Sequence, residues 1–393
     1  MLTQLKEQPA DKILALMDLF RADTRADKID LGVGVYKNAQ GETPVMRAVK
    51  QAEQRLIQQQ TTKSYVALAG DPAYLDSMIA LVLGGIVPRS RIAAVATPGG
   101  TGAVRQAFEL IRLANPKARV FISEPSWPNH RSMLTYLKMP MGQYRYFDTS
   151  TRAVDFPAML ADLQAAQAGD VVLLHGCCHN PTGANLNLPQ WQQVVDLINE
   201  KALTAMIDLA YQGFGDGLED DAAATRLVAR SLGACLIAAS CSKNFGIYRE
   251  RSGILMAIGS DDSHTPIVQQ NLNYLNRQNF SFPPDHGARV VSTILNDPEL
   301  RADWAAELEE MRQNMLRLRT ALAEELRRLS RSDHYGFIAQ HRGMFSQLGL
   351  SPAVVEKLRK ENAIYMVGDS RINIAGLNAQ AVPVLAQAII AAA

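Results

Sequence analysis

The chain is poor in several features that mark whole classes of protein. It has four cysteines in 393 residues, which is too few for a disulfide framework, so reduced thiols in a cytoplasm are the simplest interpretation. The formal net charge of +1 indicates neither nucleic acid nor an acidic membrane surface as a partner. No apolar run approaches the roughly 20 residues that cross a bilayer, and the first residues lack the basic and apolar regions of a secretory signal. We therefore expect a cytoplasmic protein without membrane or nucleic-acid partners.

The composition is that of an ordinary globular protein, with 47% hydrophobic and 20% charged residues. Between about residues 90 and 260, short apolar runs alternate with amphipathic helical patterns such as 102–114 and 189–202. This alternation predicts an α/β domain with a mostly parallel sheet flanked by helices on both faces. In such sheets, ligands bind outside the carboxyl ends of the strands. The expected strands are Ala93–Ala96, Val120–Ser123, Val171–His175, Ala205–Asp208 and Leu236–Ser240.

The pattern changes after Pro284. Residues 298–330 have apolar side chains three or four apart and predict one long helix. The segment after it mixes two helices with short strands, expected at Ile364–Val367 and Ile372–Ala375, and so predicts a smaller α+β domain. A helix at Lys12–Arg21 is expected to pack with that domain. The predicted organisation is an N-terminal arm with part of the small domain at 1–41, a large domain at 42–300, and the linking helix with the small domain at 301–393.

A lysine follows the last expected strand, in the sequence Ser240-Cys241-Ser242-Lys243. A lysine at the mouth of a parallel sheet, beside small hydroxyl residues, suits a Schiff base to an aldehyde cofactor. The alternative is an ordinary surface lysine. The Ser-x-x-Lys spacing also matches a serine acyltransferase motif, but the accompanying Ser-Asp-Asn and Lys-Thr-Gly elements are absent from the sequence.

The preceding expected strand ends in Asp208, with Tyr211 three residues later. A carboxylate that closes an apolar strand needs a partner, because burying an unpaired charge is costly. A protonated pyridine nitrogen is one such partner, and Tyr211 could then reach an oxygen on the same ring. The alternative is an aspartate that caps the next turn.

The sequence HGCCHNPTG follows the strand 171–175. His175, Cys177, Cys178 and His179 resemble soft metal ligands, but they crowd into five positions and no second cluster follows at zinc-site spacing. We therefore predict no metal. The Asn-Pro-Thr-Gly turn would instead present the Asn180 amide at the sheet edge.

Glycines and small residues at 97–102 precede an expected helix, and free amides at a helix start can bind phosphate. This pattern matches neither the Walker A motif nor the dinucleotide fingerprint. Arg251 could add a charge-assisted contact to the same phosphate. Trp127 lies between prolines in another strand-end loop, where it suits stacking on a flat ring, although a core aromatic is the alternative.

None of these features is specific alone, but their order along one sheet closely resembles the fold-type I, class I aminotransferases that use pyridoxal 5'-phosphate. The sequences HGCCHNPTGANL, DLAYQGFGDGLEDDAA, SCSKNFGIYRERSG and RGMFS most resemble the bacterial aromatic amino-acid branch of the aspartate aminotransferase family. The resemblance extends from Ala10 to the C-terminus. It implies a large α/β domain with a smaller α+β domain, and a homodimer with shared active sites.

The resemblance also implies roles for the strand-end residues. Lys243 would form the Schiff base and move a proton between the substrate α-carbon and the cofactor. Asp208, with His130 behind it, would pair with the pyridinium nitrogen, and Tyr211 would be the third catalytic residue. The other implied cofactor contacts are Gly100, Thr101, Trp127, Asn180, Ser240, Ser242, Arg251 and, from the neighbouring subunit, Tyr65.

The implied substrate contacts are centred on two arginines. Arg371, with Gly34 beside it, would bind the α-carboxylate, and a bidentate pair explains why an arginine is needed. Arg277 would bind the distal carboxylate of aspartate or glutamate across the dimer interface. Phe282 stands near Arg277 where aspartate-selective relatives have asparagine, which favours aromatic side chains. Trp127 and Asn180 complete the expected substrate-binding set.

The predicted function is transamination of tyrosine, phenylalanine and tryptophan with 2-oxoglutarate, with aspartate and glutamate as further substrates. An aspartate aminotransferase with dicarboxylate preference is the alternative. A non-catalytic amino-acid sensor and a Ser-x-x-Lys acyltransferase are more distant ones. A sensor would not need to keep Lys243, Asp208 and Arg371 together.

Overall fold

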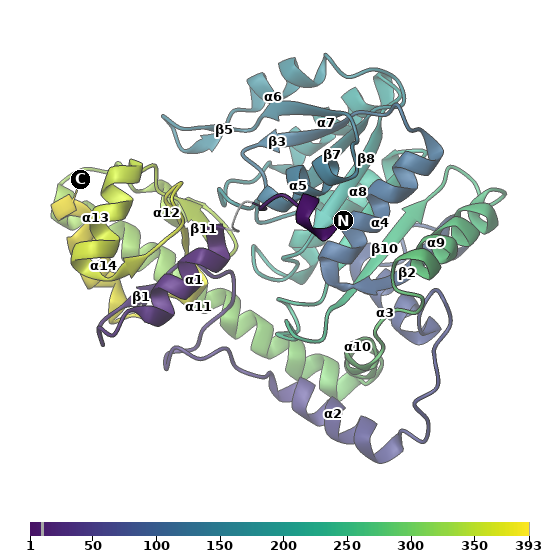
Figure 1. Ribbon diagram of the computed structural model, residues 1–393, viewed down its shortest axis with the longest axis horizontal. Coiled ribbons are helices and arrows are strands. Elements are labelled where there is room, and N and C mark those ends of the chain that lie inside the picture. The colour runs from purple at the N-terminus through teal and green to yellow at the C-terminus, as the bar shows by residue number, and fades with distance from the viewer. Residues whose placement is uncertain (9–11, 393) are drawn as a thin grey trace. The chain divides into compact units, whose positions relative to one another are not determined.

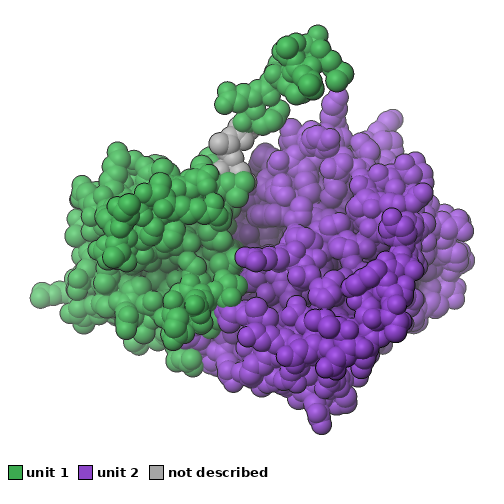
Figure 2. Space-filling view, turned by 60° about the horizontal axis from the view of Figure 1, so that its bottom comes forward, with its two compact units in different colours: residues 1–43, 315–393 green, residues 44–314 purple. Residues whose placement is uncertain are grey.

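The computed structural model describes residues 1–8 and 12–392. Ala10, where the sequence resemblance begins, lies outside the described residues. The chain divides into two compact units, one made of Met1–Thr43 with Met315–Ala393 and the other of Pro44–Asn314 (Figure 2). We call these unit 1 and unit 2. The division falls at residues 43 and 315, whereas the sequence placed the domain boundaries at 41 and 300.

The later boundary at residue 315 lies within a single helix, α11 (Pro298–Ser330). The first part of α11 packs within unit 2. Trp304 stacks on Phe245 with ring centroids 4.5 Å apart, and its indole nitrogen donates to the Asn244 carbonyl oxygen at 2.8 Å. The periodicity of the sequence predicts the helix correctly at both ends, but it does not show which unit each part packs against. Among the described residues, no helix is both long and apolar enough to cross a membrane.

The core of unit 2 is a seven-stranded sheet, mostly parallel (Figure 1). Only β10 runs antiparallel, pairing with both β2 and β9. The five expected strands are present, which confirms the predicted sheet. Strands β10 and β4 were not among the expected strands. In spatial order the strands are β2 (Ile92–Pro98), β10 (Ser252–Ile258), β9 (Cys235–Ser240), β8 (Thr204–Leu209), β7 (Val171–His175), β3 (Val120–Glu124) and β4 (Met141–Arg145).

Helices cover both faces of this sheet (Figure 1). Leu236, Ala238 and Leu255 face the apolar side of α4 (Gly99–Ala114), in a core that also includes α5 (Pro128–Tyr136). Since alternate strand residues point to opposite faces and every residue of β9 and β10 is buried, the other face must also be covered. Helix α3 (Pro72–Leu83) contacts β2 and β10 there, and α8 (Leu218–Ser231) contacts β9. The remaining elements of unit 2 are α2 (Arg47–Gln59), α6 (Phe156–Leu163), α7 (Leu188–Glu200), α9 (Thr265–Asn279), α10 (His286–Asn296), β5 (Phe147–Asp148), β6 (Ala153–Val154) and the 3-10 turn Arg89–Arg91.

Unit 1 joins the two ends of the chain. Strand β1 (Ile29–Asp30) pairs in parallel with β12 (Ile364–Tyr365), and β11 (Phe345–Gln347) pairs antiparallel with β13 (Arg371–Asn373). The expected strand 372–375 ends at Asn373, whose side chain accepts from the Ala375 amide and starts a 3-10 turn, Ile374–Gly376. The expected strand 364–367 is likewise shorter and ends at Tyr365. The helices are α1 (Lys12–Ala22), α12 (Phe337–Gln340), α13 (Pro352–Asn362), α14 (Ala381–Ala392) and the short 3-10 helix Leu2–Gln4.

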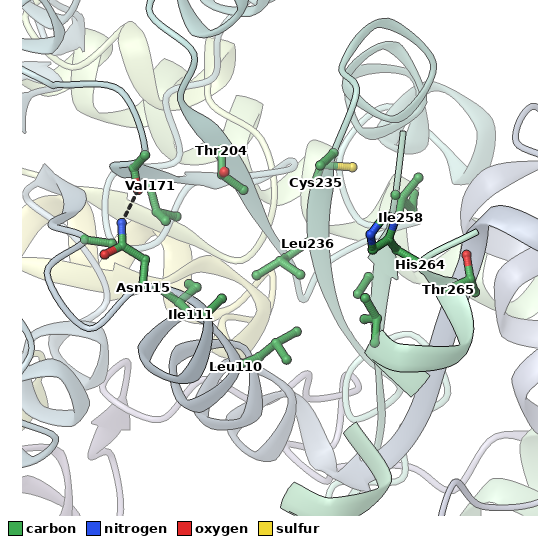
Figure 3. Close-up of a pocket in the computed structure, with 17 residues that line it drawn as sticks. Leu110, Ile111, Asn115, Val171, Thr204, Cys235, Leu236, Ile258, His264 and Thr265 are labelled. Atoms are coloured by element: carbon green, nitrogen blue, oxygen red, sulfur yellow. Dashed lines mark hydrogen bonds between the residues drawn. The ribbon is translucent and has the colours of Figure 1, made fainter. Parts of the chain in front are cut away.

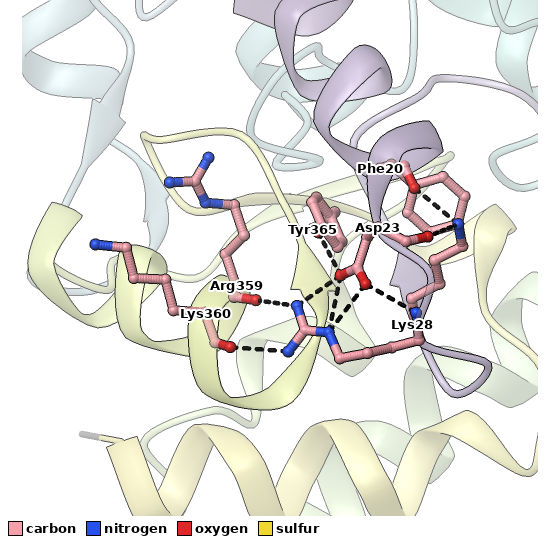
Figure 4. Close-up of polar contacts among 7 residues, drawn as sticks. Phe20, Asp23, Lys28, Arg359, Lys360 and Tyr365 are labelled. Atoms are coloured by element: carbon pink, nitrogen blue, oxygen red, sulfur yellow. Dashed lines mark hydrogen bonds and ion pairs between the residues drawn. The ribbon is translucent and has the colours of Figure 1, made fainter.

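A polar cluster fastens the segment after α1 to the end of α13 (Figure 4). Arg25 donates to the carbonyl oxygens of Arg359 at 3.0 Å and Lys360 at 2.8 Å. These are among the last carbonyls of the helix, which have no partner inside it. Asp23 holds the other side of the guanidinium at 2.6 Å and accepts from the Tyr365 hydroxyl at 2.6 Å. The hydrogen bonds from Arg25 and then Tyr365 lower the pKa of Asp23 well below its usual value.

Candidate functional site

The polar residues that the sequence places after strands gather at one edge of the unit 2 sheet. Strands β2, β9, β8, β7 and β3 run in the same direction, so their carboxyl ends meet at that edge. His175 ends β7 and is directly paired with Asp208 of β8. Lys243 follows three residues after the end of β9, and Gly99 directly follows β2. The edge therefore carries a carboxylate, an amine and a glycine-rich turn.

Asp208 is held by a histidine. The His130 Nε2 atom lies 2.9 Å from a carboxylate oxygen of Asp208, whose side chain is only 12% exposed. Burial raises the pKa of Asp208. The His130 hydrogen bond and the positive charge of the nearby Lys243 outweigh this effect, so the pKa lies below its usual value. Asp208 is therefore a carboxylate that stays charged although it is largely buried.

A chain of hydrogen bonds fixes the direction of the His130 contact. The Asn180 backbone N–H donates to His175 Nδ1 at 3.5 Å, which places the His175 proton on Nε2, facing Ser126 Oγ at 3.2 Å. The Ser126 hydroxyl then donates to His130 Nδ1 at 2.9 Å, so His130 donates from Nε2 to Asp208. These tautomers follow from the partners each ring nitrogen has. Burial is the main cause that lowers the pKa of His175 to about 3, and the nearby His130 lowers it further. His175 is therefore neutral. The sequence analysis missed Ser126, which has no recognisable spacing except its place four residues before His130.

Lys243 lies against an aromatic ring, with its Nζ 4.8 Å from the ring centroid of Tyr211. Burial lowers the pKa of Lys243 to about 8, with a smaller lowering from Arg251 and an opposing effect of the Asp208 charge. A lysine in this range carries an appreciable fraction of neutral amine near neutral pH, which a nucleophile or base requires. The Tyr211 hydroxyl accepts from the Asn180 side-chain amide at 3.4 Å. The structure thus brings Asn180, Tyr211 and Lys243 together as the sequence predicted.

The glycine-rich turn forms a close-packed cradle at the start of α4. A Cβ on Gly100 would lie 2.9 Å from the Ser240 Cβ, and one on Gly253 would lie 2.5 Å from the Gly99 carbonyl carbon. Gly99 also has a positive φ of 69°, which side chains disfavour. The helix begins at Gly99, three residues earlier than expected, because propensity rules place glycines outside helices. Only glycine fits this approach of α4 to β9 and β10.

Arg251 adds a cation and ties the cradle to the lysine loop. Its Nη1 donates to Ser242 Oγ at 3.2 Å, and the Ser242 amide donates to Ser240 Oγ at 3.2 Å. Thr101, in the first turn of α4, is exposed. Two hydroxyls, a guanidinium and the backbone amides in the first turn of α4 form a donor set suited to a phosphate group.

Trp127 packs edge-on against His130, with ring centroids 5.1 Å apart and planes at 89°. It precedes α5, with Pro128 as the first helical residue, and is partly buried against the core of the sheet. The indole therefore lies directly beside the Asp208–His130 pair, at the sheet edge that the sequence predicted for it.

Tyr65 and Arg277 form a cluster of their own on unit 2. Tyr65 is 84% exposed and stacks on Phe282 with ring centroids 4.7 Å apart. The Arg277 guanidinium lies 5.7 Å from the centroid of the same Phe282 ring, and it donates to the Ser281 hydroxyl. Phe282 thus links the two residues that the sequence assigned to a neighbouring subunit's site.

Arg371 and Gly34 lie together in unit 1. Arg371 is 4% exposed, donates from Nη2 to the Gly32 carbonyl oxygen at 2.7 Å, and lies 4.3 Å over the centroid of the Phe345 ring. A Cβ on Gly34 would lie 2.9 Å from the Phe345 Cζ, so Gly34 leaves room for that ring. Phe345 belongs to the RGMFS segment, but nothing in the sequence links it to Arg371.

The cysteine-rich segment does not form the ligand set that the sequence first suggested. His179 contacts Ser123 at 3.0 Å and Thr182 at 2.9 Å through its two ring nitrogens. Within the described residues, the group that could hold a metal is Cys177, Cys178 and Asp221. The Asp221 carboxylate already accepts from three backbone amides, those of Gly213, Gly215 and Asp216.

An apolar cavity of about 300 Å³ lies at the opposite end of the sheet (Figure 3). It is lined by the starts of β7, β8 and β9, the end of β10, and parts of α4 and α9. Figure 3 shows apolar side chains such as Leu110, Leu236 and Ile258 around it. Its lining has no carboxylate, lysine or arginine. Asp208, Lys243 and Arg251 do not line this cavity and lie at the carboxyl ends of the strands instead.

The comparisons with known proteins agree with this arrangement. The sequence matches the family described as aminotransferase class I and II over residues 26–389. The chain is 59% identical to an aromatic-amino-acid aminotransferase of Paracoccus denitrificans, over 99% of both chains, and 42% identical to an aspartate aminotransferase of Salmonella typhi, over all of both. A solved aromatic-amino-acid aminotransferase of Burkholderia pseudomallei, covalently bound to pyridoxal phosphate, superposes with a TM-score of 0.97 at 41% identity, covering 100% of this chain and 99% of that one. Together with the strand-end lysine, aspartate and glycine cradle, these matches show that the chain belongs to the class I and II aminotransferases.

Proposed function

We propose that the protein is a pyridoxal-phosphate-dependent aminotransferase that acts on tyrosine, phenylalanine and tryptophan with 2-oxoglutarate, and also on aspartate and glutamate. The observation that carries the proposal is the arrangement at the sheet edge. A charged, largely buried Asp208 and a Lys243 with a pKa of about 8 lie at neighbouring strand ends, beside a phosphate-type cradle. The relatives named for aromatic amino acids support the substrate class.

The residues present fit the proposed cofactor. The cradle of Gly100, Ser240, Ser242 and Arg251 offers donors to a phosphate, and Thr101 in the first turn of α4 would add to them. Asp208 would pair with a protonated ring nitrogen, which satisfies a charge that the fold has buried. The Asn180–Tyr211 pair would hold the ring oxygen, and Trp127 would stack on the ring. When bound, pyridoxal phosphate would supply an aldehyde that takes the amino group and a ring that withdraws electrons.

Side chains of the protein would carry out the proton transfers and keep Asp208 charged. Lys243 Nζ would accept the proton from the substrate α-carbon and return it at the other end of the transfer. With a pKa of about 8, roughly one in ten of these amines is neutral at pH 7. His130 would keep Asp208 charged by donating to it from Nε2, which the Ser126 hydroxyl enforces at Nδ1. Tyr211 beside Lys243 would keep the amine in place through its ring face.

The two arginines would divide substrate recognition. Arg371, beside Gly34, would bind the α-carboxylate that every amino acid has, and its nearly complete burial would strengthen the contact. Arg277 would bind the second carboxylate of aspartate and glutamate. The Phe282 ring under Arg277 supports an apolar alternative for aromatic side chains. Arg277 itself favours the second candidate, an aspartate aminotransferase with dicarboxylate preference.

We also propose that the enzyme is a cytoplasmic homodimer with shared active sites. The exposed Tyr65–Phe282 stack supports a partner at that surface. The four cysteines are buried and form no disulfide, which is compatible with a reducing compartment.

Mixed dimers test the shared site. Lys243→Ala and Arg277→Ala should each act poorly on aspartate alone. If the two residues serve one site from opposite chains, a hybrid of the two variants holds one native site and should regain aspartate activity. Hybrids no better than their parents, with mixing confirmed by mass, would place both residues in the same chain's site.

The experiment that tests the main proposal is an absorbance spectrum of protein loaded with pyridoxal phosphate, taken before and after adding phenylalanine and, separately, aspartate. We expect both amino acids to convert the absorbance band of the lysine-bound cofactor to that of the pyridoxamine form. At equal low concentrations, phenylalanine should convert more of the band than aspartate does. Conversion by aspartate alone would establish the dicarboxylate alternative. No conversion by any amino acid would overturn the aminotransferase proposal.

A further inference from the structure

We infer that Arg319, a fully buried arginine of α11, is a positioning residue that holds Arg371 in place through Phe345. The inference rests on the proposed function, because it takes Arg371 to be the residue that binds the substrate α-carboxylate. All three residues belong to unit 1.

Arg319 has no solvent exposure and is surrounded by oxygen atoms from one short segment. Its Nη1 donates to the Ile338 carbonyl oxygen at 3.1 Å and to Ser346 Oγ at 2.7 Å. Its Nη2 donates to the carbonyl oxygens of Gly343 at 2.8 Å and Phe345 at 2.7 Å. A buried cation is strongly unfavourable unless several well-placed groups replace its water. The guanidinium therefore makes the segment 338–346 fold around it in one arrangement.

That segment supports the substrate arginine. Phe345 begins β11, which pairs with β13, the strand that starts with Arg371. Arg319 holds the Phe345 backbone oxygen, and the Phe345 side chain lies under the Arg371 guanidinium at 4.3 Å. The ring also lies close to the Gly34 backbone, where an added Cβ would meet its Cζ at 2.9 Å. A shift of Phe345 would therefore move the surface on which Arg371 rests.

The geometry requires an arginine at position 319. A planar guanidinium presents donors in a fixed fork, and here two of its nitrogens serve four oxygens of the segment. A lysine keeps the charge but has one nitrogen with three donors, so it cannot hold both sides of the segment. Ser346 is also fixed by His341, whose Nδ1 lies 3.1 Å from Ser346 Oγ. None of these contacts reaches Arg371 directly. Arg319 therefore acts on Arg371 only by fixing the position of the segment that contains Phe345.

The test compares Arg319→Lys with Arg312→Lys as a matched control. Arg312 is a partly buried arginine of α11, and it pairs with Glu309 at 2.6 Å and donates to the Gly215 carbonyl oxygen, both in unit 2. For Arg319→Lys we expect KM for phenylalanine and for aspartate to rise together by about tenfold or more, with kcat and cofactor affinity changed much less. Arg312→Lys should leave both KM values within about twofold. Unchanged KM values for Arg319→Lys, with only a lower Tm, would overturn the inference.

A double-mutant cycle separates positioning from general destabilisation. If Arg319 acts through Phe345, the KM effects of Arg319→Lys and Phe345→Leu should not add, and the double variant should resemble the more affected single variant. Simple multiplication of the two effects would overturn the link through Phe345. If Arg319→Lys does not fold, Ser346→Ala is used instead, because it removes one of the four oxygen partners of Arg319. This variant should raise KM for both substrates by a few fold. No rise in KM would overturn the inference. Arg371→Leu is measured in parallel: if it leaves KM unchanged, the proposed role of Arg371 has failed, whatever Arg319 does.

Discussion

The two units build their functional residues in opposite ways. In unit 2, the sheet gathers the ends of several strands, so Asp208, Lys243 and the glycine cradle come together through the topology alone. In unit 1, Arg371 depends on single contacts from distant parts of the chain, such as its bond to Gly32, 339 residues away in sequence. The sheet thus gathers its residues through regular structure, whereas Arg371 is held by individual contacts.

The largest effect is expected at Lys243. Lys243→Ala should lower kcat by at least the 10²–10⁴-fold typical of losing a general base. The cofactor should still bind, because the cradle around Gly100 and Arg251 is intact, and equilibrium dialysis would measure this. In the native enzyme, borohydride reduction and peptide mapping should place the label on Lys243. A label on another lysine would contradict the assignment.

The next effect compares the two arginines. Arg371→Leu should lower kcat/KM for phenylalanine and aspartate alike, since both present an α-carboxylate. Arg277→Leu should lower kcat/KM for aspartate by roughly 30- to 4,000-fold, from the 2–5 kcal/mol that truncating one partner of a desolvated pair costs. It should change phenylalanine little. Equal losses on both substrates for Arg277→Leu would show that Arg277 does not bind the distal carboxylate.

A moderate effect is expected for Asp208→Asn. A charge-assisted hydrogen bond contributes about 1.5–3 kcal/mol, so transamination should slow by roughly 10- to 150-fold. The same change has a sign that can be tested without turnover. The Asp208 charge raises the pKa of Lys243, so removing it should move that pKa below its present value of about 8. The midpoint of amine labelling against pH in cofactor-free protein should therefore shift to lower pH, and an upward shift would contradict the electrostatic assignment.

The smallest effect is expected for Ser126→Ala. This variant removes the hydroxyl that donates to His130 Nδ1 and leaves the contact of His130 with Asp208. A neutral hydrogen bond is worth about 1 kcal/mol, so kcat should fall by about fivefold. Ser123→Ala, whose hydroxyl contacts His179, is the matched control and should change kcat less. A loss as large as that of Asp208→Asn would mean that Ser126 does more than fix a tautomer.

The sequence predicts the sheet edge well, for a physical reason. Buried parallel strands are continuous apolar runs, and the polar residue that ends each run, such as Asp208 or His175, marks the edge. Strand β10 (Ser252–Ile258) does not fit the alternation of strands and helices, because no helix lies between it and β9. The supports of Arg371 could not be predicted, because Phe345 and Arg319 have no periodic relation to it. The division between the units falls within α11 at Met315, and a continuous helix has one sequence pattern whichever unit it packs in.

The cluster around Arg25 has a consequence for the way the chain is made. Arg25 donates to a carbonyl oxygen 335 residues later in the sequence, and β1 pairs with a strand that begins at Ile364. At the usual synthesis rate of about 5–20 residues per second, the first segment waits roughly 15–70 s on the ribosome before its partners exist. All residues of unit 2 precede Met315, so its sheet can form during that wait. The segment around Arg25 and β1 is therefore synthesised early but folds late. Its apolar residues stay exposed until β12 and α13 have been synthesised.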